Sequence, residues 1–276
     1  MNLKHIINEI ENVDPEVHER LDTRRQALKD FSRMAGKVAI AAAVPFALGS
    51  MFKKAYGQST ASLFDVLNYA LTLEYLEAEF YKMGNDAAGL IPAGAPAAAI
   101  KTIGDHETAH VAFLQAAIAA AGGTPVTKPK FDLTAKGTFP TVFSDYATFL
   151  AVAQTFEDTG VRAYKGQAAN PNLMANNDVL TAALNIHSVE ARHASHIRQM
   201  RKANGFGDVK PWITGKESGI GAVVQASYDG EEITNQAGIE IVNINGQSVS
   251  SDAASEAFDE PLSMDQVLAI VKPFFA

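Results

Sequence analysis

The sequence predicts an all-α fold: a four-helix bundle with one long crossover connection, followed by an irregular carboxy-terminal extension that contains a short helix. Three observations lead to this prediction. Apolar residues recur at helical spacing in four long segments. The four segments form two similar pairs, and a stretch rich in proline and glycine separates the pairs. With 276 residues, 47% of them hydrophobic, the chain has ample material for a buried core.

The composition excludes several functional classes. The net charge of −8 argues against a nucleic-acid partner, because phosphate binding needs a basic face. The chain has no cysteine, which excludes disulfides, thiolate metal sites, a rubredoxin-type iron centre and a cysteine nucleophile. Any bound metal must therefore be held by histidine, carboxylate or tyrosine side chains.

Residues 1–57 resemble a twin-arginine export signal. Arg24 and Arg25 precede the apolar run Val38–Phe52, which at 15 residues is shorter than the ~20 needed to span a bilayer. Ala55 and Gly57, with Tyr56 between them, form the small-x-small pattern that signal peptidase accepts. The expectation is a protein exported by the twin-arginine machinery to the periplasm or beyond, and anchored in the membrane if the signal stays uncleaved. The alternative is a buried amino-terminal helix with an accidental arginine pair.

The first pair of helices is predicted within residues 58–204, the expected bundle domain. Residues 62–84 form the first helix, since Ser62 is a good N-cap and a Gly-Asn pair follows. Residues 97–121 form the second helix, which two glycines end. Residues 124–140 hold three prolines and a glycine and therefore read as a long connection rather than an element.

The second pair repeats the first. The third helix is expected over residues 144–167 and the fourth over 176–204, with an Asn-Pro pair between them. Adding 83 to a residue number in the first pair gives its counterpart in the second. The pattern Glu-x₆-Tyr, followed 33 residues after its glutamate by Glu-x-x-His, occurs once in each half: Glu74, Tyr81, Glu107 and His110, then Glu157, Tyr164, Glu190 and His193.

The spacing of these residues predicts a site for two metal ions. Glutamate and histidine three positions apart lie on one helix face, so both side chains reach the same point. A lone Glu-x-x-His is a weak signal, whereas two copies, each paired with a further glutamate, match the donor set of dinuclear carboxylate bundles. Four carboxylates and two imidazoles suit two divalent iron or manganese ions, with iron slightly favoured. The predicted ligands are Glu74, Glu107, His110, Glu157, Glu190 and His193.

These segments resemble the ferritin-like superfamily, which includes bacterioferritin, rubrerythrin and manganese catalase. More narrowly, residues 68–81 and 105–110 resemble the ferritin-like domain family that includes plant desiccation-related proteins. The resemblance covers about residues 60–204. It implies terminal carboxylates at Glu74 and Glu157, bridging carboxylates in the two Glu-x-x-His motifs, and a terminal histidine in each motif.

Several neighbours of the predicted ligands leave alternatives open. Tyr81 and Tyr164 are either hydrogen-bond partners of the ligands or simple packing residues. Glu77 either substitutes for Glu74 or faces solvent, and Glu74 is preferred because the counterpart of Glu77 is a glycine. His106 is a candidate to hydrogen-bond a ligand imidazole across the bundle. The two histidines that flank the fourth-helix motif, His187 and His196, are expected near the ligands or at the surface.

Residues 205–276 form the predicted extension. Alternating stretches at 223–228 and 239–244 predict small hairpins or an extended wrap. Ser263 and Gln266 form a capping-box pattern that predicts a last short helix. The extension is expected to cover the bundle or to build an oligomer contact, so a homo-oligomer stays open.

Two classes of function follow. The first is a dinuclear oxidoreductase acting on O₂ or peroxide in stress protection, with ferroxidase, peroxidase or catalase activity. The alternative is a non-catalytic metal-binding or structural protein of desiccation-related type.

Overall fold

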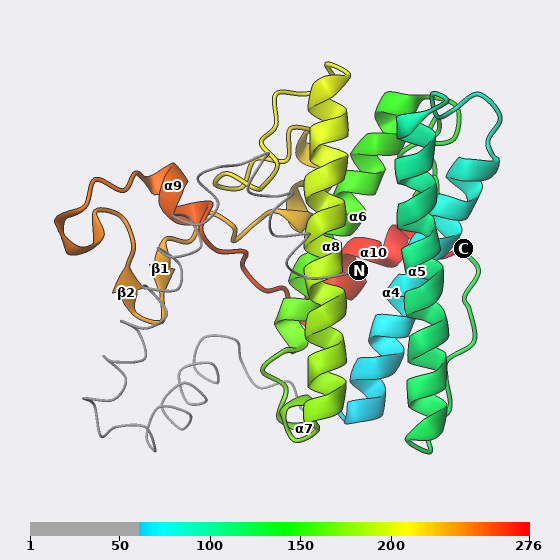
Figure 1. Ribbon diagram of the computed structural model, residues 1–276, viewed down its shortest axis with the longest axis horizontal. Coiled ribbons are helices and arrows are strands. Elements are labelled where there is room, and N and C mark those ends of the chain that lie inside the picture. Colours follow the sequence, from blue (N-terminus) through cyan, green and yellow to red (C-terminus); the bar gives the residue numbers. More distant parts are fainter. Residues whose placement is uncertain (1–60) are drawn as a thin grey trace, which may run out of the picture. The chain divides into compact units, whose positions relative to one another are not determined.

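The computed structural model describes residues 61–276 (Figure 1). The predicted export signal lies outside the described residues. Four long helices, with a one-turn helix before the last of them, form the bundle: α4 (Leu63–Asp86), α5 (Ala95–Ala120), α6 (Tyr146–Gln167), α7 (Pro171–Met174) and α8 (Asn177–Ala203). Within residues 61–276, no helix combines the length and the apolar character needed to cross a bilayer.

The predicted all-α fold is confirmed, and the local signals explain where its helices begin. The four long helices start and end within two residues of the predicted bounds. At the start of α4 the Ser62 hydroxyl accepts from the Asp65 N–H, while the Asp65 carboxylate accepts from the Ser62 N–H. This capping box satisfies two amide groups that the first helical turn leaves unpaired.

The bundle consists of two helical hairpins. Helix α4 packs along α5, and α6 packs along α8 (Figure 1). The predicted long connection lies between the hairpins, over residues 121–145. It is held by the end of the chain, because the Asp132 N–H donates to the Phe274 carbonyl at 2.8 Å and the Ala276 N–H donates to the Lys130 carbonyl at 3.0 Å.

Aromatic packing fixes α4 against α6 on one side of the bundle. Phe80 is fully buried and stacks on Phe149, with ring centroids 4.8 Å apart and planes 4° apart. The Phe156 ring packs edge-on against the Phe80 ring, with centroids 5.1 Å apart. Such pairs add to the free energy of apolar burial and hold the backbone of both helices in one register.

The carboxy-terminal extension differs in part from the sequence prediction. Residues 223–228 are predicted to form a small hairpin or an extended wrap, but residues 222–227 form a 3₁₀ helix, so that prediction is wrong. A small hairpin is present, but its two strands flank Ala237 and Gly238, which both have positive φ. The capping box at Ser263 and Gln266 is confirmed. The elements of the extension are η1 (Ala222–Ser227), β1 (Asn235–Gln236), β2 (Ile239–Glu240), η2 (Ile244–Gly246), α9 (Ser251–Ser255), α10 (Met264–Val271) and η3 (Lys272–Phe274).

Buried arginines attach the extension to the bundle. Arg162 of α6 donates to the backbone carbonyls of Ser227 at 2.6 Å, Asp229 at 3.0 Å and Glu260 at 2.8 Å. It also pairs with the buried Glu231 carboxylate at 2.6 Å. These bonds satisfy backbone carbonyl groups at the end of the 3₁₀ helix and in two irregular stretches of the extension.

Candidate metal centre

The six predicted ligands come together in the core of the bundle, one or two from each long helix. Their donor atoms form two overlapping groups, and within each group the atoms lie within 4.8 Å of one another. The first group contains Glu74 and His110, and the second contains Glu157 and His193. Both groups include Glu107 and Glu190.

The first group is organised around His110. Its Nδ1 lies 3.2 Å from Glu74 Oε2, 3.1 Å from Glu107 Oε2 and 3.3 Å from Glu190 Oε1. The three carboxylates are fully buried, and the imidazole is 12% exposed. The i,i+3 spacing of the Glu-x-x-His motif thus brings both its side chains to the same point.

The second group repeats this arrangement around His193. Its Nδ1 lies 2.8 Å from Glu107 Oε1 and 3.3 Å from both Glu157 Oε2 and Glu190 Oε2. Glu107 and Glu190 therefore each offer one oxygen to either side, while Glu157 faces one side only. Two carboxylates are thus shared by both donor groups, and Glu74 and Glu157 belong to one group each.

The two tyrosines of the repeat bond across the bundle. Tyr81 of α4 donates to Glu157 Oε1 of α6, and Tyr164 of α6 donates to Glu74 Oε1 of α4. Each tyrosine follows its own glutamate by seven residues, so these exchanged contacts require α4 and α6 to run in opposite directions. Helices α5 and α6 then run the same way, and the connection between them must return along the whole bundle.

Burial and mutual charge shift the pKa values of the cluster strongly. Burial raises the pKa of Glu107 well above its ordinary value and that of Glu157 to about 7. For Glu190, the two nearby imidazoles outweigh the effect of burial and lower the pKa to about 2. The carboxylates overcome burial at His110 and His193 and raise both pKa values to about 12. The imidazoles thus stand in as the positive charge of the site.

The donor set fits a dinuclear metal centre. Among the described residues, Glu107 Oε1, Glu157 Oε2, both Glu190 oxygens and His193 Nδ1 are buried and reach no hydrogen-bonding geometry. Buried carboxylate oxygens without partners are costly. The carboxylate oxygens lie 2.8–3.3 Å from imidazole nitrogens without hydrogen-bonding geometry, and within 4.8 Å of the other donor atoms of their group. Two cations would satisfy these atoms together.

Glu77 is a further carboxylate at this centre. Its side chain is 5% exposed, so of the two alternatives left open by the sequence, the solvent-facing one does not hold. A Cβ built on Gly160 would lie 3.3 Å from Glu77 Oε1 and 3.7 Å from Glu190 Cγ. Burial and then Glu190 raise the pKa of Glu77 well above its ordinary value. The repeat in the sequence already indicated this position, because the counterpart of Glu77 in the second half is Gly160, whose missing side chain leaves room for one extra carboxylate.

Three further histidines lie in the part of the chain that the structure describes, and one of them contacts a predicted ligand. His106 Nδ1 lies 2.9 Å from His193 Nε2, and the two rings stack with centroids 5.2 Å apart. His106 therefore keeps the Nδ1 edge of His193 toward the carboxylates. His187 Nδ1 lies 3.0 Å from the Val161 carbonyl, and His196 is exposed.

Removing the tyrosine hydroxyls is expected to weaken metal binding. In Tyr81→Phe and Tyr164→Phe, one oxygen of a terminal glutamate loses its donor and its orientation, so metal affinity should fall about 10–100-fold in each variant. Competition with a chelator measures this affinity. Tyr75→Phe is the matched control on α4, because the Tyr75 hydroxyl bonds Gln115 and not a ligand. Equal affinities in all three variants would contradict the assignment.

Comparison with models of protein families gives one match. A family model described as a ferritin-like domain matches residues 62–203, which include every residue of the cluster. A search of curated proteins finds no match.

Proposed function

The chain belongs to the ferritin-like domain family, and from this premise we propose that its bundle holds two iron or two manganese ions, with iron favoured, and reacts with O₂ or peroxide. The observation that carries the proposal is the pair of overlapping donor groups that share Glu107 and Glu190. A group of this kind is compatible with metal binding in general. Its oxygen-rich composition favours the harder cations iron and manganese.

The six predicted ligands would have two kinds of role in holding the ions. Glu107 and Glu190 would hold both ions, while Glu74 with His110 and Glu157 with His193 would each complete one of them. Tyr81 and Tyr164 would keep the terminal carboxylates in place by donating to the other oxygen of Glu157 and of Glu74. Such a centre supplies electrons and Lewis acidity to an oxygen-containing substrate.

Solvent access points to one side of the centre. The four carboxylates are fully buried, His193 is 6% exposed and His110 is 12% exposed. A small oxidant such as peroxide would thus approach beside His110. The buried remainder keeps bulk water away from the ions, which strengthens the electrostatic interactions there.

The test is elemental analysis of the purified chain, followed by ferrous-oxidation and peroxide-consumption assays. The expected result is about two metal ions per chain and turnover that a chelator abolishes. Bound metal without turnover would overturn the enzymatic proposal in favour of a metal-binding stress protein. Absence of iron and manganese after growth with both metals would favour a structural role.

We also propose that the chain is exported in folded form. The support is the arginine pair at 24–25 ahead of a short apolar run. Replacing both arginines with lysine is expected to leave the precursor in the cytoplasm, because the twin-arginine machinery reads the pair itself. Cell fractionation and immunoblotting measure the distribution. Unchanged export of the double variant would rule out this pathway.

A further inference from the structure

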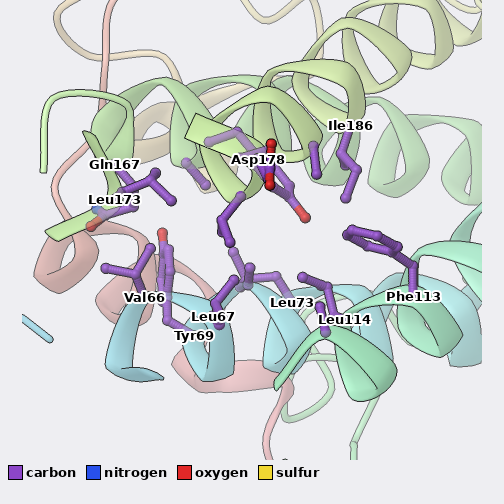
Figure 2. A pocket seen from close by; sticks show the side chains of 17 residues that line it. Val66, Leu67, Tyr69, Leu73, Phe113, Leu114, Gln167, Leu173, Asp178 and Ile186 are labelled. Atoms are coloured by element: carbon purple, nitrogen blue, oxygen red, sulfur yellow. The ribbon is translucent and has the colours of Figure 1, made fainter. Parts of the chain in front are cut away.

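A cavity of about 280 Å³ lies between α4, α5, α6, α7 and α8 (Figure 2). Its wall is almost entirely apolar, with Leu67, Leu73, Leu114 and Ile186 among the side chains that face it. The volume is roughly twice that of a 150 Å³ apolar cavity known to bind benzene. It is therefore large enough for a ring that carries a short alkyl chain.

Two buried polar side chains belong to the otherwise apolar lining at one end of the cavity. Tyr69 and Gln167 lie together at that end of the cavity, beside Val66 and Leu173 (Figure 2). Tyr69 is 7% exposed and Gln167 is 4% exposed. Among the described residues, the Tyr69 hydroxyl and Gln167 Oε1 have no hydrogen-bond partner. Buried polar atoms are normally paired, so these two atoms point to a ligand.

The two atoms specify the polar group of that ligand. Burial, with a contribution from Glu77, raises the pKa of Tyr69, so its hydroxyl keeps the proton and can donate. Gln167 Oε1 is an acceptor. A single hydroxyl group on the ligand can accept from Tyr69 and donate to Gln167, and so satisfy both.

Charge at the cavity excludes an anionic ligand. The lining residues include no lysine, arginine or histidine. The one ionised side chain among them is Asp178, which is exposed. A carboxylate such as that of a fatty acid would meet no cation there and would be repelled by Asp178.

We propose that this cavity binds a small neutral molecule with an apolar body and one hydroxyl group, such as an alkylphenol. Tyr164 lines the cavity and also donates to Glu74 of the candidate metal centre. The bound molecule would thus lie one side chain from the metal ligands, a statement that rests on the proposed function. The binding itself does not.

Calorimetry on the full chain tests the proposal with three related probes: 4-propylphenol, propylbenzene and 4-propylbenzoate. The phenol is expected to bind at least about tenfold more tightly than the other two, since a hydrogen-bonded hydroxyl satisfies groups that are otherwise unpaired. Tyr69→Phe should remove most of that preference and leave propylbenzene binding unchanged. Equal binding of phenol and propylbenzene, or tighter binding of the benzoate, would overturn the proposal.

Two variants on α8 locate the site. Ala183→Phe places a ring in the cavity and should abolish binding of 4-propylphenol. Leu184→Phe is the matched control, because Leu184 is 46% exposed and lies outside the cavity lining. If Ala183→Phe binds the phenol as the wild type does, the cavity is not the site.

Metal content separates this proposal from the preceding one. The variant Glu107→Gln/Glu190→Gln changes no lining residue, so it should bind 4-propylphenol with the wild-type affinity. If the wild-type chain binds 4-propylphenol but takes up no metal, the cavity proposal stands and the metal-centre proposal is refuted. Metal uptake without phenol binding would do the reverse.

Discussion

Replacing Glu107 and Glu190 together with glutamine is expected to reduce bound metal from about two ions per chain to less than a tenth of that amount. Each of these residues contributes oxygens to both donor groups, so the double variant removes the shared part of the site. Glutamine keeps the shape of glutamate and loses its charge. Redox activity should disappear with the metal.

The double variant is expected to stay folded. Its two amides replace carboxylates that are fully buried beside other carboxylates, and buried amides are less costly than unpaired buried charges. Elemental analysis is done on samples with matching helical circular-dichroism signals. Asp208→Asn/Glu217→Gln is the control with the same loss of charge, because both of those side chains are exposed. Wild-type metal content in the Glu107/Glu190 variant would reject the site assignment.

Replacing Asp158 with alanine is expected to destabilise the fold by about 3–5 kcal/mol. Arg198 donates to this carboxylate from Nε at 3.0 Å and from Nη2 at 2.5 Å, and the Tyr228 hydroxyl donates to it at 2.8 Å. The arginine and aspartate side chains are 1% and 4% exposed. Without the carboxylate, a buried guanidinium is left without its counter-charge.

Urea unfolding in the presence of a chelator measures this loss, since bound metal would add its own stabilisation. Asp86→Ala is the matched control. It breaks an ion pair with Lys82 whose side chains are 65% and 68% exposed, so it should cost at most about 0.5 kcal/mol. The double change Asp158→Leu/Arg198→Met should recover about half of the loss or more, because it removes both charges. A loss below about 1 kcal/mol in Asp158→Ala would contradict a structural role for the pair.

The repeat in the sequence was sufficient to predict the bundle and to select six residues for its centre. Helical periodicity and end signals such as Ser62 and Asp65 depend on local interactions, so they can be read from neighbouring residues. The 83-residue repeat adds long-range information, because similar sequences fold into similar hairpins. Two like hairpins then present equivalent side chains, such as His110 and His193, to one core.

Only the tertiary structure decided the features that depend on contacts between distant segments. The exchanged bonds of Tyr81 and Tyr164 follow from the opposite directions of α4 and α6, and the spacing along one helix contains no such information. Glu77 lies at the centre because Gly160 on another helix leaves space for it.

The conformation of the extension and the polar groups of the cavity also depend on contacts between distant segments. The stretch 223–228 is predicted to be a hairpin or extended, yet residues 222–227 form a 3₁₀ helix, and Arg162 of α6 donates to the carbonyl of Ser227 at its end. The Tyr69 hydroxyl and the Gln167 side-chain carbonyl, which have no hydrogen-bond partner among the described residues, lie at a cavity that residues of five helices line. Local pattern determines the type of most helices, because their hydrogen bonds are local. Packing between elements determines which polar groups are left to bind something else.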